Sequence, residues 1–206
     1  MWFGAKARSF KYLSARALAL IQNSLIQNST LKPSPLPKSQ DQFNRVIQNV
    51  RALQLSPQQL NAKPNAKTWS VGEILQHLMR VHDQYRPRLE PLLDPKHRPG
   101  TAARWGIGAG FFGKMLKGVT HPKAKKKTKT LGQFEPTRSH FDTTIIEQFV
   151  AHSTAFQRLL AAIPEARYNE NISSPAGTWV VLPVHDVIEL LGNHMERHWN
   201  QLETVV

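Results

Sequence analysis

No cysteine occurs anywhere in the 206 residues of the chain. Disulfide bonds, thiolate metal ligands and a cysteine nucleophile are therefore excluded, so any metal ion must be bound through nitrogen and oxygen atoms. Long apolar runs are also missing, because none approaches the ~20 residues that a membrane-spanning helix requires. Patterns typical of β-strands are scarce. These absences favour a helical, cytoplasmic protein.

Acidic residues are absent from the first 40 residues, which hold six lysines and arginines. The apolar stretch at residues 17–21 is shorter than the ~7–15 residues of a signal-peptide core, and Arg16 precedes it. A transit peptide would have a similar composition. We favour an extra surface helix or arm over a targeting segment.

The net charge of +13 is distributed unevenly. Residues 1–40 and 96–140 together hold 17 of the 27 basic residues but only one of the 14 acidic residues, Glu135. The rest of the chain is slightly acidic, so the basic character belongs to two appendages. The cluster Lys123–Lys129 suits weak contact with a polyanion or membrane surface, although a solvated loop is the simpler interpretation. No motif for specific nucleic-acid binding is present.

Helical spacing of apolar residues predicts one basic N-terminal helix and four further helices. The predicted helices occupy residues 3–28, a segment from Ser39, a segment from Ser70, residues 139–163, and a segment from Pro183. Ser39 with Gln42 and Ser70 with Glu73 both have the spacing of a capping box, in which Glu73 is expected to cap rather than to bind a ligand.

This pattern predicts an all-α fold, a four-helix bundle. Residues 1–38 form a basic helix or arm with a proline-rich linker, and residues 39–206 form the bundle. Residues 96–140 are a long basic connection between the second and third bundle helices. Residues 165–182 are expected to be irregular or briefly extended.

Three histidines fall on the apolar stripes of these helices. His77 lies on the same face as Ile74, and His194 and His198 are four residues apart on one side of the last helix. A buried imidazole needs a partner, which is either a hydrogen-bonding group or a shared metal ion. Taken one at a time, each of these residues is more simply a structural histidine.

Read together, two separated segments resemble the DinB-like superfamily. They are Trp69-Ser-Val-Gly-Glu-Ile-Leu-Gln-His77-Leu and His194-Met-Glu-Arg-His198-Trp-Asn-Gln201, and the resemblance covers roughly residues 39–206. It implies a four-helix bundle, often dimeric, in which His77, His194 and His198 bind a divalent metal ion such as zinc or nickel. It also implies chemistry similar to that of the thiol S-transferases of this superfamily.

Three neutral imidazoles would leave coordination positions open for water or substrate. An ion held in this way can activate water or a thiol as a nucleophile. Since the chain has no cysteine, the thiol would come from a small cosubstrate. We therefore expect a metal-dependent thiol S-transferase or hydrolase, without identifying a catalytic side chain. The alternatives are a non-catalytic metal-binding or stress-response module, and a polyanion-binding protein that uses the basic appendages.

The sequence also predicts roles for four residues near the three histidines. Gln201, one turn beyond His198, either supports that histidine or packs on the helix surface. Trp69 is expected to be a core anchor, and Glu196 is expected to meet solvent. His82 lies about 140° around its helix from His77, so it is not expected to be a ligand.

Overall fold

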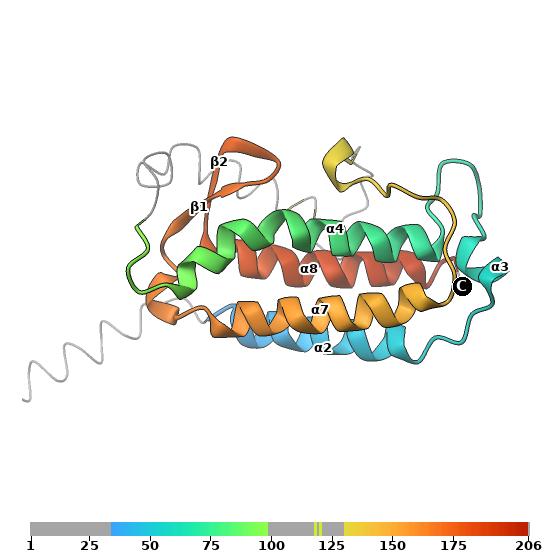
Figure 1. Ribbon diagram of the computed structural model, residues 1–206, viewed down its shortest axis with the longest axis horizontal. Helices are drawn as coiled ribbons and strands as arrows, with labels where there is room; N and C mark the ends of the chain where they lie inside the picture. The colour runs from blue at the N-terminus through green and yellow to red at the C-terminus, as the bar shows by residue number, and fades with distance from the viewer. Residues whose placement is uncertain (1–33, 99–117, 119, 121–129, 206) are drawn as a thin grey trace, which may run out of the picture. The chain divides into compact units, whose positions relative to one another are not determined.

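The computed structural model describes residues 34–98, 118, 120 and 130–205, which belong to a compact unit spanning Ser34–Val206. The described residues form a helical bundle with one small β-hairpin (Figure 1), so the all-α prediction is confirmed. The predicted helix at 3–28 and the Lys123–Lys129 cluster lie outside the described residues.

Four long helices make up the bundle, joined by short elements. The long helices are α2 (Leu36–Arg51), α4 (Val71–Leu89), α7 (Thr144–Ala162) and α8 (Val184–Leu202). The short elements are α3 (Pro57–Asn61), the 3-10 helices η1 (Glu90–Leu93), η2 (Gly132–Phe134) and η3 (Glu165–Arg167), and the strands β1 (Asn171–Ser174) and β2 (Gly177–Pro183).

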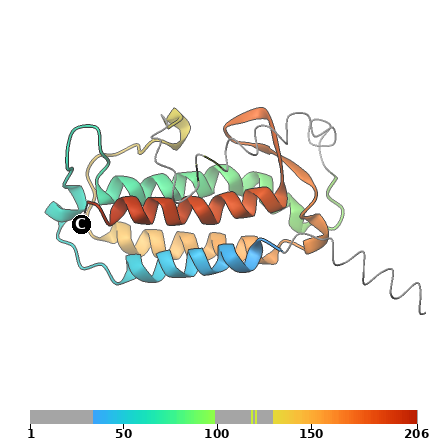
Figure 2. The same cartoon turned by 180° about the vertical axis from the view of Figure 1, so that it is seen from behind.

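Each long helix packs against two others, so that α2 touches α7 and α8, and α4 touches the same two helices. Figures 1 and 2 show that α2 and α8 run in one direction while α4 and α7 run in the other. Because α4 and α7 are parallel, the chain must return along the length of the bundle between them. This return explains the long connection that the sequence places between the second and third bundle helices.

The start of α4 is set by its capping box, as the sequence predicts. The Ser70 hydroxyl accepts a hydrogen bond from the Glu73 N–H at 3.3 Å, and the Glu73 carboxylate accepts one from the Ser70 N–H at 2.8 Å. Lys63 neutralises the buried Glu73 carboxylate through an ion pair of 2.6 Å. The helix therefore begins at one defined residue, which fixes the direction of every side chain that follows it.

The predicted start of α2 is wrong. This helix begins at Leu36, and Ser39 and Gln42 lie inside it, so they form no capping box. The Ser39 hydroxyl instead donates to the Ile188 carbonyl at 2.8 Å, and the Gln42 amide donates to the Asn193 side chain at 3.0 Å. Both side chains are buried and join α2 to α8.

The start of α7 also differs from the prediction, because the helix begins at Thr144 rather than near residue 139. The Asp142 carboxylate accepts a hydrogen bond from the Thr144 N–H at 2.9 Å and so marks the boundary. Phe141 precedes the helix and is buried against Gly72, where a larger residue would collide with its ring.

A β-hairpin connects α7 to α8 within the segment that was expected to be irregular or briefly extended. Its antiparallel strands β1 and β2 pair Ile172 with Leu182, and Ser173 with Val181. Ile172 and Leu182 form a cross-strand pair on one face of the hairpin and are buried in the core, so that face covers part of the bundle.

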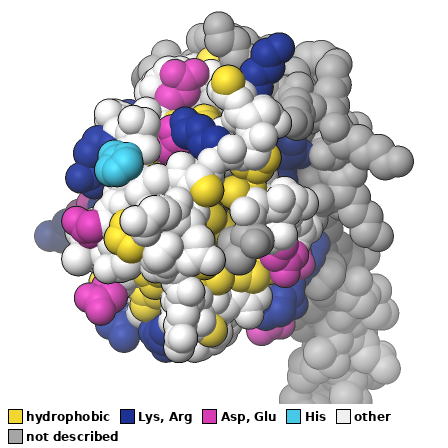
Figure 3. All heavy atoms as spheres, turned by 90° about the vertical axis from the view of Figure 1, so that its right-hand side faces the viewer, with side chains coloured by type: hydrophobic (Ala, Val, Ile, Leu, Met, Phe, Trp, Pro, Cys, Tyr) yellow, Lys and Arg dark blue, Asp and Glu magenta, His cyan; other side chains and the backbone are white. Residues whose placement is uncertain are grey.

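The core forms where the helical spacing predicts it. Buried apolar residues of α4, α7 and α8 include Ile74, Leu78, Val81, Tyr85, Ile145, Phe149, Phe156, Leu160, Val187, Leu191 and Met195. Some apolar side chains remain visible between polar ones at the end of the bundle where α2 ends and α7 begins (Figure 3). Within the described residues, no helix is long and apolar enough to cross a membrane.

Candidate metal site

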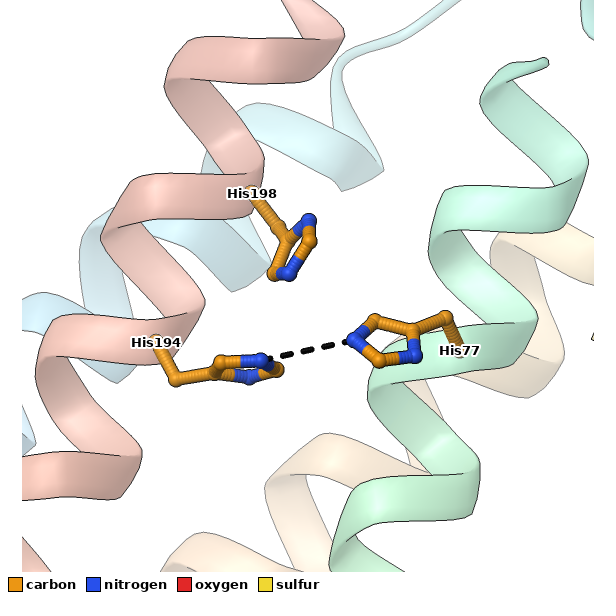
Figure 4. Close-up of side chains that lie close together, drawn as sticks. All are labelled: His77, His194 and His198. Carbon is orange, nitrogen blue, oxygen red and sulfur yellow. Dashed lines mark hydrogen bonds between the residues drawn. The ribbon is translucent and has the colours of Figure 1, made fainter. Parts of the chain in front are cut away.

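The three histidines come together between two antiparallel neighbours, α4 and α8. His77 lies two turns into α4, and His194 and His198 occupy successive turns of α8. Figure 4 shows the three rings turned toward one another in the space between these helices. The spacing of four residues on α8 and the defined start of α4 thus produce one cluster from segments far apart in the chain.

The distances within the cluster suit a shared ion. One ring nitrogen from each histidine lies within 4.8 Å of the others. His77 Nε2 and His194 Nε2 are 3.3 Å apart. Two imidazole nitrogens bound to one tetrahedral ion at about 2.0–2.1 Å lie about 3.3–3.4 Å from each other. The distance between these two nitrogens therefore already equals the distance expected between two ligands of one ion.

Two of the rings are oriented by hydrogen bonds on their outer side. His77 Nδ1 donates to the Phe134 carbonyl at 2.7 Å, and His198 Nδ1 donates to Gln201 Oε1 at 2.9 Å. Because a carbonyl oxygen can only accept, these bonds place the proton of each neutral imidazole on Nδ1. The Nε2 lone pairs are then left free and directed into the cluster.

The surroundings keep the imidazoles uncharged. Burial lowers the pKa of His77 to about 4, despite the opposing effect of the Phe134 carbonyl. Burial, and then the neighbouring histidines, also hold the pKa values of His194 and His198 well below their usual range. Metal binding requires neutral imidazoles, so protons compete for this site only under acidic conditions.

Trp69 covers one side of the cluster. Its ring centroid lies 4.8 Å from that of His77 and 6.3 Å from that of His198. His77 and His198 have exposed fractions of only 3% and 8%, whereas His194 is half-buried. Among the three histidines, His194 is therefore the one with the largest exposed fraction.

The η2 turn, which supplies the Phe134 carbonyl, is held in place from two directions. The Arg80 guanidinium, one turn beyond His77, donates to the Gln133 carbonyl at 2.8 Å. The Gln133 amide in turn donates to the Pro175 carbonyl at the tip of the hairpin. The orientation of His77 thus depends on the long connection and the hairpin as well as on α4.

A protein-family model described as the DinB superfamily matches residues 42–202, well over half of the chain. The chain belongs to the DinB superfamily. Comparison with curated proteins and comparison with solved structures each found no match. The matched range contains all three histidines and most of the bundle, in agreement with the resemblance seen in the sequence.

In this DinB-superfamily chain the donor set fits a metal ion. Imidazole nitrogens suit zinc, nickel and related divalent ions. Within the described ranges, no carboxylate and no further histidine joins the group of three. The three histidines can therefore hold an ion while leaving positions for other ligands, an arrangement typical of catalytic sites.

For the residues near the cluster, the structure agrees with some of the sequence predictions and differs from one. Gln201 does support His198, and His82 is not part of the group, although it is buried. Glu196 lies away from the cluster but does not simply meet solvent, because it accepts hydrogen bonds from Arg45 at 2.8 Å and from Gln42 at 2.6 Å. Its carboxylate therefore helps to join α8 to α2.

Sequence reasoning missed the contribution of η2 and the contact of Trp69 with the histidine rings. The Phe134 group that orients His77 is a backbone carbonyl, which any residue type provides, so no sequence signal could have revealed it. Trp69 is only half-buried and faces the histidine rings, in addition to packing against the core. Its position directly before the cap of α4, two turns before His77, was the available signal.

Proposed function

We propose that this protein is a metal-dependent enzyme that binds one divalent ion, zinc or nickel, through His77, His194 and His198. The reaction we propose is activation of a small-molecule thiol or water for attack on a small electrophile. The observation that carries this proposal is the convergence of three neutral imidazoles, two of them with Nδ1 already engaged.

A divalent ion with open positions supplies one chemical property, which is to lower the pKa of a thiol or water that binds beside the histidines. The absence of cysteine from the chain means that a thiol nucleophile must arrive with a cosubstrate. A thiol S-transferase and a hydrolase therefore share this site and differ only in which nucleophile binds there.

The side chains around the cluster would position the reactants. Trp69 covers the His77 and His198 rings, so substrates would approach from the side of His194. The Phe134 carbonyl and the Gln201 amide keep two rings in the orientation that a ligand requires. Such positioning lowers the cost of reorganisation during the reaction.

A two-arm activity assay tests the proposal. The full chain, loaded in turn with zinc and nickel, is incubated with 1-chloro-2,4-dinitrobenzene and either glutathione or free cysteine, and separately with p-nitrophenyl acetate in water. Metal-dependent product formation in either arm is expected, with loss of activity in the His194→Ala/His198→Ala variant. The matched control is His140→Ala, which alters an exposed histidine outside the group.

Two outcomes would contradict the enzymatic proposal in different ways. A protein that binds the ion but shows no metal-dependent turnover with a broad panel of thiols and esters would be a metal-binding module without catalysis. Turnover that is unchanged in the double variant would place the reaction elsewhere in the chain.

A further inference from the structure

The segment at residues 131–138, here called the strap, lies against α4 beside the histidine cluster. Apart from the three residues of η2, it contains no helix or strand. Its residues are exposed except for Phe134 and Pro136, which are half-buried. A segment that buries so little apolar surface gains little local stability from packing. The position of the strap therefore depends on the hydrogen bonds that attach it to its neighbours.

Three residues of α4 hold the strap in place. Gln76 Oε1 accepts a hydrogen bond from the Thr137 N–H at 2.8 Å. The His77 ring and the Arg80 guanidinium donate to the carbonyl groups of two adjacent η2 residues, at 2.7 Å and 2.8 Å. One of these three anchors is thus a metal ligand of the proposed site, so His77 connects the attachment of the strap to the state of that site.

Gln133 joins the strap to the β-hairpin. Its side-chain amide donates to the Pro175 carbonyl in the turn between β1 and β2, while its own backbone carbonyl accepts from Arg80. Among the residues that the structure describes, no other hydrogen bond connects the strap to the hairpin. Figure 1 shows η2 and the hairpin on the same side of the bundle, and both contact α4. Gln133 is therefore the polar link between the turn that orients His77 and the tip of the hairpin.

We propose that Gln133 is a positioning residue for the metal site, and that through it metal binding and the tip of the hairpin stabilise each other. This inference rests on the metal binding of the proposed function, but not on the proposed reaction. Gln133 has no contact with the cluster itself. It holds η2 so that the Phe134 carbonyl stays on His77 Nδ1, and groups that accept a hydrogen bond from a ligating histidine raise its affinity for metal.

The coupling has a physical cause in the imidazole ring. When Nε2 of an imidazole binds a cation, its Nδ1–H becomes a stronger hydrogen-bond donor. The bond from His77 to the Phe134 carbonyl would therefore strengthen, and this bond exists only while the strap lies on α4. Metal binding then favours the attached strap, and the attached strap favours metal binding by the same free energy, because linkage between two equilibria is reciprocal.

A first experiment measures zinc affinity in the full chain. Gln133→Met keeps the length of the side chain and removes only the donor to Pro175. We expect the zinc affinity, measured by competition with a chromophoric chelator, to fall by about tenfold. The matched control is Gln58→Met, which changes an exposed glutamine of α3 outside the strap and should leave the affinity unchanged.

A second experiment follows the exchange of single amide hydrogens by NMR, with and without zinc. In the wild-type chain, zinc should slow exchange at the Thr137 N–H, which bonds to Gln76, and at the Ala176 N–H in the hairpin turn, which bonds to Ser174. In Gln133→Met, zinc should still slow exchange at Thr137 but no longer at Ala176. A purely structural role for Gln133 would instead change exchange equally with and without zinc.

The outcomes separate this inference from the metal site on which it rests. A wild-type chain that binds no zinc would overturn both. If the wild type binds zinc, then an unchanged zinc affinity in Gln133→Met would overturn the positioning role alone. Zinc-dependent protection of Ala176 that is absent from the wild type, or that persists in Gln133→Met, would overturn the coupling to the hairpin.

Discussion

His77 Nε2 and His194 Nε2 face each other across 3.3 Å, although 117 residues separate them along the chain. In the absence of an ion, one of these nitrogens must carry a proton to bond with the other, whereas a bound ion would engage both lone pairs. The short separation therefore belongs to a site whose ligands are arranged before metal binds. Such prearrangement reduces the cost of binding.

Removal of both α8 ligands should abolish metal binding. We expect the purified chain to contain about one divalent ion, and the His194→Ala/His198→Ala variant to contain none, because one imidazole alone cannot retain it. Elemental analysis after gel filtration measures this ratio, with His140→Ala as the matched histidine control. An unchanged metal content in the double variant would refute the assignment of the site.

Loss of the Gln201 acceptor should weaken metal binding without removing a ligand. In Gln201→Leu the His198 Nδ1–H loses its partner, so the ring is no longer held in the tautomer and orientation that direct Nε2 into the cluster. We expect metal affinity to fall by about 10–100-fold. Competition with a chromophoric chelator measures the affinity. Asn200→Leu, an exposed substitution at the adjacent position, should leave it unchanged.

His82 should reduce stability at acid pH. Its ring is buried between Phe156, at a centroid distance of 4.3 Å, and Phe43, at 5.5 Å, and its Nδ1 has no hydrogen-bond partner. Burial, and then the nearby His152 and Arg86, hold the pKa of His82 well below its usual value of 6.5. Below pH 6.5 the unfolded chain takes up a proton that the folded chain does not, so the free energy of unfolding falls.

His82→Phe keeps an aromatic ring in this stack and removes the titrating group. We expect the free energy of unfolding to rise by about 1 kcal/mol at pH 7.5, because a buried unpaired nitrogen is lost. We also expect a smaller loss of stability between pH 7.5 and pH 5. Urea unfolding with chelator present measures both effects, and His140→Phe serves as the exposed control. An equal or steeper pH dependence in His82→Phe would argue against this role.

Gly192 should be required where α8 crosses α2. A methyl group at this position would lie 2.7 Å from the Ser39 hydroxyl oxygen and 3.0 Å from Ser39 Cα, and would also collide with the Gln42 side chain. Because backbone stands in the way, we expect Gly192→Ala to lower the free energy of unfolding by about 1–3 kcal/mol. Gly132→Ala, which meets nothing within 4 Å, is the control for thermal or urea unfolding. If Gly192→Ala were as stable as Gly132→Ala, α8 and α2 would be able to move apart without loss of stability, and Gly192 would not be required.

Much of the helical framework could be predicted because its signals are local. The capping box of α4 depends on residues three positions apart, and the buried faces of α4 and α8 follow a helical period. The same local pattern misled at Ser39 and Gln42, whose side chains turn to α8 instead of capping α2. The hydrogen-bond acceptors of these two side chains lie on α8, far away in the sequence, so a local pattern could not predict them.

The residue types in two segments, and the spacing between His194 and His198, were enough to identify the family and to nominate the three histidines. Helical geometry places side chains four residues apart on one face, so part of the site follows from the chain itself. The approach of His77 to within 3.3 Å of His194 instead required α4 and α8 to pack side by side. The Phe134 carbonyl reached His77 only because η2 packs against α4 and is held there by Arg80. A backbone group has no identity in a sequence, so this part of the site arises solely from the packing of distant segments.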